Sequence, residues 1–342
     1  MNREFPPPAI ADLDRVSAGE YLSLCRALKS EPCTIAVGAG VSASSGLPSW
    51  KTLLRKIAST YFYHWEFDIE RGKSSSRRPP RDLSIAFWED MFWSDSAKEA
   101  ADSLVATEDA LRAAQMIKTS VRPRDWNYLV RKALYGSSRF NPSELLLAIA
   151  GVCSIPGCEV ELLSYNYDNL VETALLAHGT HATSIYEPAQ KRIAGTVPIY
   201  YPHGYLKQDG GPTVPIVLGE EDYNEYAVDQ YGWQNTVQLG LFSRSTTIFI
   251  GFSLVDPHVR RLLWVAKQGG GKLHYAFLPS PTAKNRTDEM LESLVDAQLW
   301  NLNVRVIRYS SGKDGNDHSR LGKLVSLLGR AIGDETALWS KE

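Results

Sequence analysis

An uncharged segment that ends in a glycine-rich turn constrains the fold of this chain more than any other feature. Residues 33–37, which read Cys-Thr-Ile-Ala-Val, predict a buried strand, and the turn Gly38–Gly40 follows at once. Apolar residues at helical spacing then begin at Trp50. A strand, a glycine turn and a helix in this order are typical of a βα unit that binds a nucleotide.

The turn also carries the residue types that a phosphate site needs. Gly38, Gly40 and Ala43 have the spacing of the dinucleotide-binding fingerprint, with alanine as its third member. We expect Gly38 to adopt backbone angles closed to other residues, and Gly40 to let a phosphate approach the main chain. Ser42 adds a hydroxyl that can donate to a phosphate oxygen. An ordinary strand-to-loop connection gives the same pattern, so the turn by itself leaves both interpretations open.

Length and charge narrow the class of protein. The 342 residues suffice for one large core, or for one core with a sizeable inserted subdomain. The chain has 37 basic and 39 acidic residues, and its net charge of −2 argues against a field that recruits nucleic acid. The polar, proline-rich start has no signal-peptide pattern, and no apolar run approaches the length of a membrane span. We therefore expect a soluble, cytoplasmic protein that binds neither membranes nor nucleic acid directly.

Strand-like and helical segments alternate along most of the chain. Six short apolar runs have strand character: residues 33–37, 159–163, 197–201, 246–250, 273–278 and 304–309. Helical stretches separate most of them, which predicts an α/β fold, a Rossmann-like parallel sheet of about six strands with helices on both faces. Residues 71–81 are polar, basic and rich in helix breakers, so we expect a solvated loop there, and from Leu83 to about Ala150 the sequence has helical character. We therefore predict a Rossmann-like domain formed by residues 1–63 and 151–342, with an inserted helical subdomain at 64–150.

Polar residues follow three of the predicted strands. Asn166 and Asp168 follow the second run, His203 follows the third, and Ser253 and Asp256 follow the fourth. Because ligands of open α/β sheets lie beyond the carboxyl ends of the strands, we expect these side chains to converge on the glycine turn. Each residue also has a structural interpretation. Asp168 and Asp256 suit helix N-caps, and His203 before a glycine suits a turn.

Four blocks of this sequence resemble the motifs of the sirtuin family, and most closely those of the bacterial sirtuin-like NADases. In chain order the blocks are Gly38-Ala39-Gly40-Val41-Ser42-x-x-Ser45-Gly46-Leu47-Pro48, Asn166-Tyr167-Asp168, Pro202-His203-Gly204 and Gly251-Phe252-Ser253-Leu254. All four occur in the family's order, spread over residues 34–260. The order and the spread make the resemblance specific.

Two departures separate the chain from the deacylases of that family. After Pro48 the family usually has an acid, an aromatic residue and an arginine, whereas this chain has Ser49-Trp50-Lys51. The deacylases also usually carry a zinc module with four cysteines. The four cysteines of this chain lack that spacing: Cys25, Cys33, Cys153 and Cys158. We therefore expect no metal.

The resemblance implies that NAD is the substrate and that its nicotinamide–ribose bond is cleaved. It implies three catalytic residues: Asn166 to hold the attacking water or the ribose hydroxyls, Asp168 to orient Asn166 or stabilise positive charge, and His203 as general base. The other histidines lack such a context. The residues implied to bind NAD are Gly38, Ala39, Gly40, Ser42, Pro48, Trp50, Asn166, Asp168, Gly251, Phe252, Ser253 and Asp256.

The function that follows is that of an NAD glycohydrolase, a gated bacterial effector of anti-phage defence that depletes NAD. Two alternatives stay open: an NAD-dependent protein deacylase, and a non-catalytic subunit that senses NAD or ADP-ribose. We also expect a homo-oligomer. A partner defence protein, such as a DNA-translocating ATPase or an Argonaute-like protein, is compatible with this function.

Overall fold

A seven-stranded parallel sheet forms the centre of the molecule. The computed structural model describes residues 6–70, 93–136, 138–211, 214–281, 285–313 and 315–339. The strand order is β3-β4-β2-β1-β5-β6-β7. The strands are β1 (Cys33–Val37), β2 (Val160–Ser164), β3 (Ala182–Ile185), β4 (Val197–Tyr200), β5 (Thr246–Ile250), β6 (His274–Ser280) and β7 (Val304–Ser310). The predicted α/β, Rossmann-like class is confirmed, with seven strands in place of about six.

The strand that the sequence prediction missed is β3, at one edge of the sheet. It has four residues and pairs only with β4. Its burial alternates, because Ala182 and Ser184 are half-buried while Thr183 and Ile185 are buried. A short edge strand with polar side chains lacks the continuous apolar run by which we identified the central strands.

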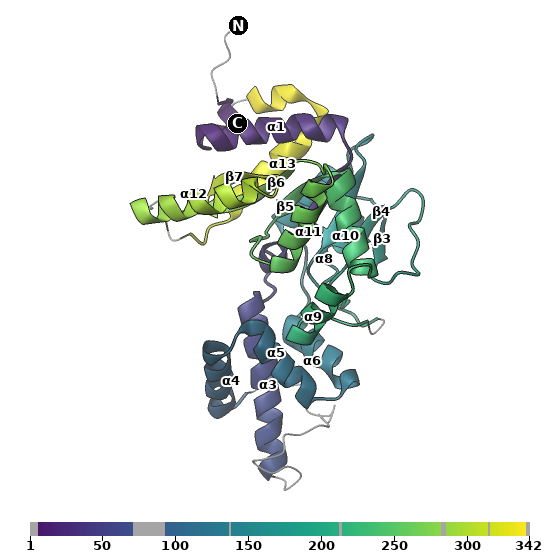
Figure 1. Ribbon diagram of the computed structural model, residues 1–342, viewed down its shortest axis with the longest axis vertical. Helices are drawn as coiled ribbons and strands as arrows, with labels where there is room; N and C mark the ends of the chain where they lie inside the picture. The colour runs from purple at the N-terminus through teal and green to yellow at the C-terminus, as the bar shows by residue number, and fades with distance from the viewer. Residues whose placement is uncertain are drawn as a thin grey trace.

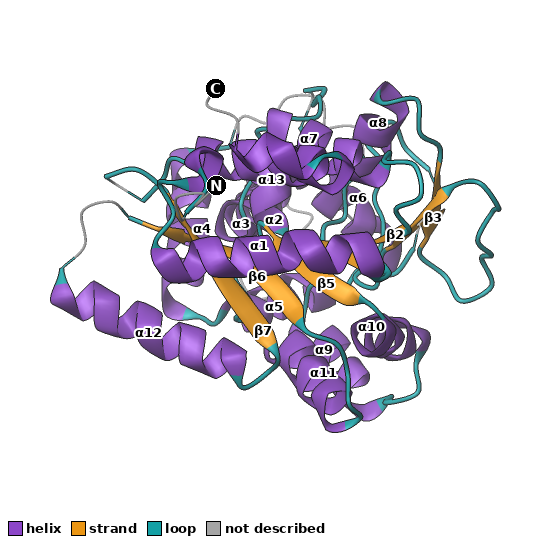
Figure 2. Ribbon diagram, turned by 90° about the horizontal axis from the view of Figure 1, so that it is seen from above, coloured by secondary structure: helices purple, strands orange, loops and turns teal. Residues whose placement is uncertain are grey.

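Helices cover both faces of the sheet (Figure 2). One face packs against α1, α7, α8 and α13, and the other against α10, α11 and the end of α12. Alternate residues of β5 face opposite layers, since Ile248 and Ile250 pack on the first side and Phe249 on the second. The helices of these two layers are α1 (Arg15–Ser30), α7 (Glu144–Cys153), α8 (Leu170–Ala177), α10 (Trp233–Arg244), α11 (Pro257–Gln268), α12 (Arg286–Trp300) and α13 (Ser319–Gly333).

A separate group of helices lies below the sheet in Figure 1, and we refer to α3–α6 as the helical layer. It consists of α3 (Trp50–Glu70), α4 (Asp95–Thr107), α5 (Ala110–Ser120) and α6 (Pro123–Tyr135), and α3 packs against the other three. The remaining elements are η1 (Pro8–Ile10), α2 (Ala39–Ala43), α9 (Glu220–Val228) and η3 (Glu335–Trp339). Across the described ranges no helix is both long and apolar enough to cross a membrane.

The predicted insertion at 64–150 overlaps the helical layer, but the two begin and end at different residues. The helix α3 begins at Trp50 and runs on without a break to residue 70, whereas α7 packs against α8 and α13 of the sheet layers. Residues 71–92 of the predicted insertion lie outside the described part of the chain. The division of the chain at 63 and 151 stays a prediction.

Strand register brings the polar loops together. Val37 at the end of β1 is level with Ser164 of β2 on one side and with Ile250 of β5 on the other. The residues that follow these three strands therefore emerge side by side at the carboxyl edge. The chain order reverses direction between β1 and β5, and such a switch point is where open α/β sheets bind their ligands.

Candidate nucleotide site at the carboxyl edge of the sheet

Two glycine loops meet backbone to backbone at the end of β1. The amide of Gly40 donates to the carbonyl of Gly251 at 2.9 Å, and the amide of Gly38 donates to Ile250 at 3.1 Å. A Cβ on Gly38 would lie 2.6 Å from the Gly251 oxygen, and a Cβ on Gly251 would lie 2.5 Å from the amide nitrogen of Val41. The three glycines thus allow the two loops to pack in direct contact.

This packing corrects the expected reason for the first glycine. Gly38 has φ −113° and ψ −177°, an extended conformation that any residue adopts, so its backbone angles do not require glycine. The requirement comes from the closeness of Gly251 and Phe252. Gly251 is the glycine with a left-handed φ of +61°. Ala39 and Gly40 are exposed, so this loop surface is open to a ligand.

Asp168 is buried beside α2. Its Oδ2 accepts a hydrogen bond from the Ser42 hydroxyl at 2.5 Å, and its Oδ1 accepts from the amide of Leu170 at 3.0 Å. The second bond helps to begin α8, as the structural interpretation of this residue predicts. Burial raises the pKa of Asp168 above its ordinary value, and the hydrogen bond from Ser42 opposes that rise. Asp168 therefore links the loop after β2 to the glycine turn after β1.

Asn166 makes a second link between the same two loops. Its side-chain Nδ2 donates to the carbonyl of Gly38 at 2.8 Å, and the residue is 8 % exposed. The bond fixes the plane of the amide, so the direction of Oδ1 is set by the protein. An amide held in this way can place one acceptor toward a ligand at the carboxyl edge.

His203 lies in an aromatic enclosure behind these loops. Its ring centroid is 5.0 Å from that of Tyr165, 5.9 Å from Tyr223 and 6.0 Å from Tyr226. Only 5 % of the residue is exposed, and its Nε2 is buried with no hydrogen-bond partner among the described residues. Burial lowers the pKa of His203 to about 4, and the negative charge of Asp256 opposes the decrease. The imidazole is therefore neutral at pH 7.

The residue after His203 has to be glycine. Gly204 has φ +98°, and a Cβ there would lie 2.3 Å from the carbonyl oxygen of Pro215. The amide of Gly204 donates to the carbonyl of Tyr201 at 3.2 Å, so the predicted turn is present. The turn and the enclosure together hold the imidazole at the end of β4.

The motif Gly251–Leu254 follows β5 and lies at the same carboxyl edge of the sheet. The Phe252 ring lies 4.8 Å from the Tyr165 ring, while Ser253 is exposed. Asp256 Oδ1 accepts from the amide of His258 at 2.8 Å and thereby caps α11, and its Oδ2 accepts from the Tyr223 hydroxyl at 3.1 Å. Both Asp256 oxygens are thus engaged by the protein. Pro48, in the loop between α2 and α3, and Trp50, the first residue of α3, are both half-buried. The NAD-binding roles of all these residues stay predictions.

Sequence reasoning missed several residues at this edge. Tyr223 and Tyr226 lie on α9, a short helix that we did not predict because its sequence is mostly polar. Tyr165 directly precedes Asn166 after the second predicted strand, and this position could have identified it as a site residue. His258 is buried, its Nε2 has no hydrogen-bond partner within the described ranges, and its ring lies 5.2 Å from that of Tyr226. The aspartate-proline pair before His258 was the only signal for it.

We predict that Gly251→Ala strongly destabilises the fold. The new Cβ would meet Val41 and would have to adopt a left-handed φ, so the free energy of unfolding should fall by about 1 to 3 kcal/mol. Gly240→Ala is the matched control, because nothing lies within 4 Å of its Cβ in the middle of α10. That change should stabilise by about 0.5 to 1 kcal/mol. Urea unfolding compares the two, and equal effects would contradict the close packing of the loops.

We also predict that stability falls as the pH drops from about 6.5 toward 4. Burial lowers the pKa of His203, His258 and His274 to about 4 in each case. The unfolded chain therefore binds protons in this window that the folded chain does not, and each histidine should contribute on the order of 1 to 3 kcal/mol. Urea unfolding at pH 7, 6 and 5 measures the effect. A free energy of unfolding that stays constant over this range would contradict it.

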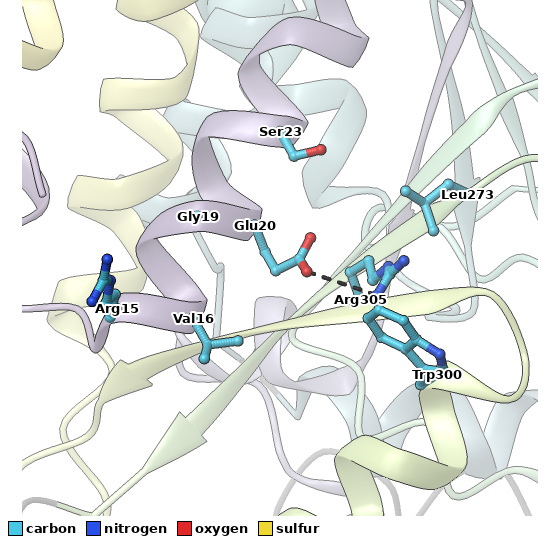
Figure 3. Close-up of a pocket in the computed structure, with 8 residues that line it drawn as sticks. All are labelled: Arg15, Val16, Gly19, Glu20, Ser23, Leu273, Trp300 and Arg305. Carbon is cyan, nitrogen blue, oxygen red and sulfur yellow. Dashed lines mark ion pairs between the residues drawn. The ribbon is translucent and has the colours of Figure 1, made fainter. Parts of the chain in front are cut away.

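A cavity of about 450 Å³ lies elsewhere, beside α1, the start of β7 and the end of α12 (Figure 3). It contains none of the predicted site residues. Arg305 lies over the Trp300 ring there, and its Nη1 is 3.9 Å from Glu20 Oε1, so these charged groups face one another. Within the described ranges, no group of three or more histidine, cysteine or acidic side chains is arranged to hold a metal ion.

Comparison with known proteins agrees with the motifs. Residues 160–307 match the family described as the SIR2-like domain. The chain is 28% identical over 176 residues to Defense-associated sirtuin 2 of Bacillus subtilis, a match that covers 49% of this chain and 16% of that protein. It is 26% identical over 145 residues to NAD(+) hydrolase ThsA of Enterococcus faecium, covering 40% of this chain and 28% of that protein. The matched part thus spans less than a third of either relative. Residues 160–307 therefore match a SIR2-like domain, and the predicted resemblance to the sirtuin-like proteins is confirmed.

Proposed function

We propose that this chain hydrolyses NAD to nicotinamide and ADP-ribose. The observation that most supports the proposal is the state of His203, a buried, neutral imidazole whose Nε2 has no partner among the described residues. In the tautomer that carries its proton on Nδ1, this nitrogen is free to accept a proton from water or from a ribose hydroxyl. A histidine with a purely structural role would be expected to use both ring nitrogens.

The reaction balances with water as the second substrate. The bond between C1′ of the ribose and the nicotinamide nitrogen breaks, and its electron pair leaves with nicotinamide as a neutral molecule. The water oxygen forms the new bond to C1′, and its proton passes through His203 to solvent. Because the transition state resembles an oxocarbenium ion, the protein has mainly to position the water and to surround the developing positive charge.

The other two predicted catalytic residues suit these tasks. Asn166 is held through Nδ2 on the Gly38 carbonyl, which leaves its Oδ1 to accept from a water or from a ribose hydroxyl. Asp168 is fixed by Ser42 and by the amide of Leu170, and when ionised it adds negative charge near the glycine turn. Ala39 and Gly40 are exposed at the start of α2, which leaves space beside the glycine turn for the pyrophosphate.

The relatives support the substrate and the biological setting. One is named a defence-associated sirtuin and the other an NAD(+) hydrolase. The residues that match the SIR2-like domain, 160–307, include Asn166, Asp168 and His203. We infer that the chain serves anti-phage defence by depleting NAD. A gated resting state, assembly into a homo-oligomer and a partner defence protein belong to the same proposal, because uncontrolled NAD cleavage would harm the host cell.

The decisive experiment incubates the purified chain with NAD and identifies the products. Release of nicotinamide and free ADP-ribose in equal amounts supports the proposal. Nicotinamide release that requires an acetyl-lysine peptide, with transfer of the acetyl group, would instead identify a deacylase. Binding of NAD without any product, at every protein concentration and with cell extract added, would identify a sensing subunit and overturn the proposal.

A further inference from the structure

The helical layer touches the short helix α9 through two polar contacts. Lys118 near the end of α5 forms an ion pair with Asp222 of α9, and the two side chains are 27% and 14% exposed. Three residues earlier on α5, the Gln115 Oε1 accepts from the amide of Glu221 at 3.2 Å. Figure 1 shows α9 between the helical layer and the helices α10 and α11. These contacts join the helical layer to the sheet domain close to His203.

The two ends of α9 are held by different neighbours. Asn235 of α10 and Arg261 of α11 donate to carbonyls of its last turn, whereas the contacts from α5 are made to its first turn. The helix has nine residues, and Tyr226 is its only buried side chain. A helix this short is marginal in water unless packing or capping stabilises it. Asp222 caps it, because Oδ2 accepts from the amides of Leu218 and Gly219 at 3.0 and 2.8 Å. The same carboxylate is held by Lys118 through Oδ1, so α5 supports the first turn of α9 directly.

Helix α9 in turn encloses His203. It supplies two of the three tyrosines around the imidazole, and the hydroxyl of Tyr226 donates to the carbonyl of Pro202. The loop that leads into α9 is bonded to the histidine itself, since the amide of Val217 donates to its carbonyl at 2.9 Å. A shift of α9 would therefore open the enclosure and admit water to the ring.

We propose that Lys118 is a positioning residue, which holds α9 through Asp222 and thereby keeps the imidazole of His203 enclosed. The helical layer then controls the environment of the candidate base from outside the site. The kinetic consequence of this inference rests on the proposed NAD hydrolysis. The structural consequence does not, because the state of the imidazole can be measured without substrate.

Loss of Lys118 should raise the pKa of His203. The ionisable groups around the imidazole come from the end of β2, from α9 and from the start of α11: Tyr165, Asp222, Tyr223, Tyr226, Asp256 and His258. Burial is the main cause of the low pKa, and the charge of Asp222 opposes it. Without Lys118, water reaches the ring and the negative charge of Asp222 is no longer balanced. Both changes favour the protonated form.

The test is Lys118→Met, which keeps the aliphatic part of the side chain and removes its charge. We expect the pKa of His203, followed by NMR of labelled histidine and assigned with His203→Ala, to rise by about one pH unit or more. Amide hydrogen exchange in α9 should accelerate in the same variant. Lys118→Arg should restore both readouts. Lys98→Met is the matched control, because Lys98 forms an exposed ion pair with Asp95 within α4 of the same layer.

A second variant separates the effect of moving α9 from the effect of removing the Lys118 charge. Gln115→Leu removes the other α5 contact without changing any charge, so it should also raise the pKa of His203 if α9 is what moves. If the wild type cleaves NAD, the acid limb of its pH profile should move upward together with the pKa in both variants. An unchanged pKa and unchanged exchange in folded Lys118→Met would overturn the inference. A raised pKa in a chain without NAD turnover would uphold it while refuting the proposed function.

Discussion

Replacing His203 with alanine should lower the rate of NAD cleavage by about 10² to 10⁴-fold, the range that a general base contributes. The reason is the geometry of the site: the imidazole is neutral, and its buried Nε2 has no partner in the part of the chain that the structure describes. No other side chain predicted to be catalytic can accept a proton as a neutral base. NAD binding should change far less than turnover. Quenched time courses of nicotinamide release, with binding measured separately by calorimetry, distinguish the two effects.

The buried position of His203 calls for a stability control. Its removal leaves a space among Tyr165, Tyr223 and Tyr226, and a cavity of this kind costs about 1 to 3 kcal/mol. Rates should therefore be compared at a temperature well below both melting temperatures. His181→Ala, at an exposed histidine, controls for the loss of an imidazole as such. Wild-type turnover in folded His203→Ala would remove this residue from the mechanism.

The same residue sets the expected pH dependence. The base acts in its neutral form, and its pKa is about 4, so protonation removes it only as the pH falls through that value. Turnover should be nearly constant from pH 7 down to about pH 5 and should then decline, provided that the fold survives. An acid limb centred near the ordinary histidine pKa would instead place the catalytic base at an exposed imidazole.

The central part of the fold was predictable because each central strand is a continuous apolar run. Residues 33–37 and 246–250 are buried along their whole length in the structure, as their uncharged sequences indicate. The strand β3 escaped detection because Thr183 and Ser184 interrupt its apolar character at the edge of the sheet. The helix α9 escaped detection for a similar reason, since its sequence is mostly polar and Tyr226 is the one buried residue among its nine. Burial on all sides leaves a clear sequence signal, and burial of one side chain does not.

In the candidate site, too, features set by the local sequence were predictable, and features set by contacts between distant segments were not. Asn166, Asp168 and His203 were found because each follows a strand, and topology alone brings such residues to one edge. Two other features could not be found in this way. The need for glycine at position 38 comes from Gly251 after the neighbouring strand β5, and the enclosure of the histidine comes from a helix whose first turn is paired with Lys118. These contacts join segments that are far apart in the sequence.

Replacing Asn166 with alanine should reduce NAD turnover by about 10²-fold or more. The side chain has two tasks in the structure: Nδ2 donates to the Gly38 carbonyl, and this bond directs Oδ1. Alanine removes the directed acceptor, and it also leaves the buried Gly38 carbonyl without its side-chain donor. We therefore expect a loss of turnover accompanied by a smaller loss of NAD affinity and by a destabilisation of about 1 to 2 kcal/mol.

A neighbouring amide provides the control that makes this result specific. Asn169 lies three residues further on, and its Oδ1 accepts from the amide of Gln208 at 3.0 Å. Asn169→Ala should therefore cost a similar amount of stability while retaining most of the turnover. If Asn166→Ala and Asn169→Ala lower turnover equally, the amide of Asn166 serves only to hold the two loops together. If NAD affinity falls as much as turnover in Asn166→Ala, the amide contacts the substrate in the ground state and gives no added support to the transition state.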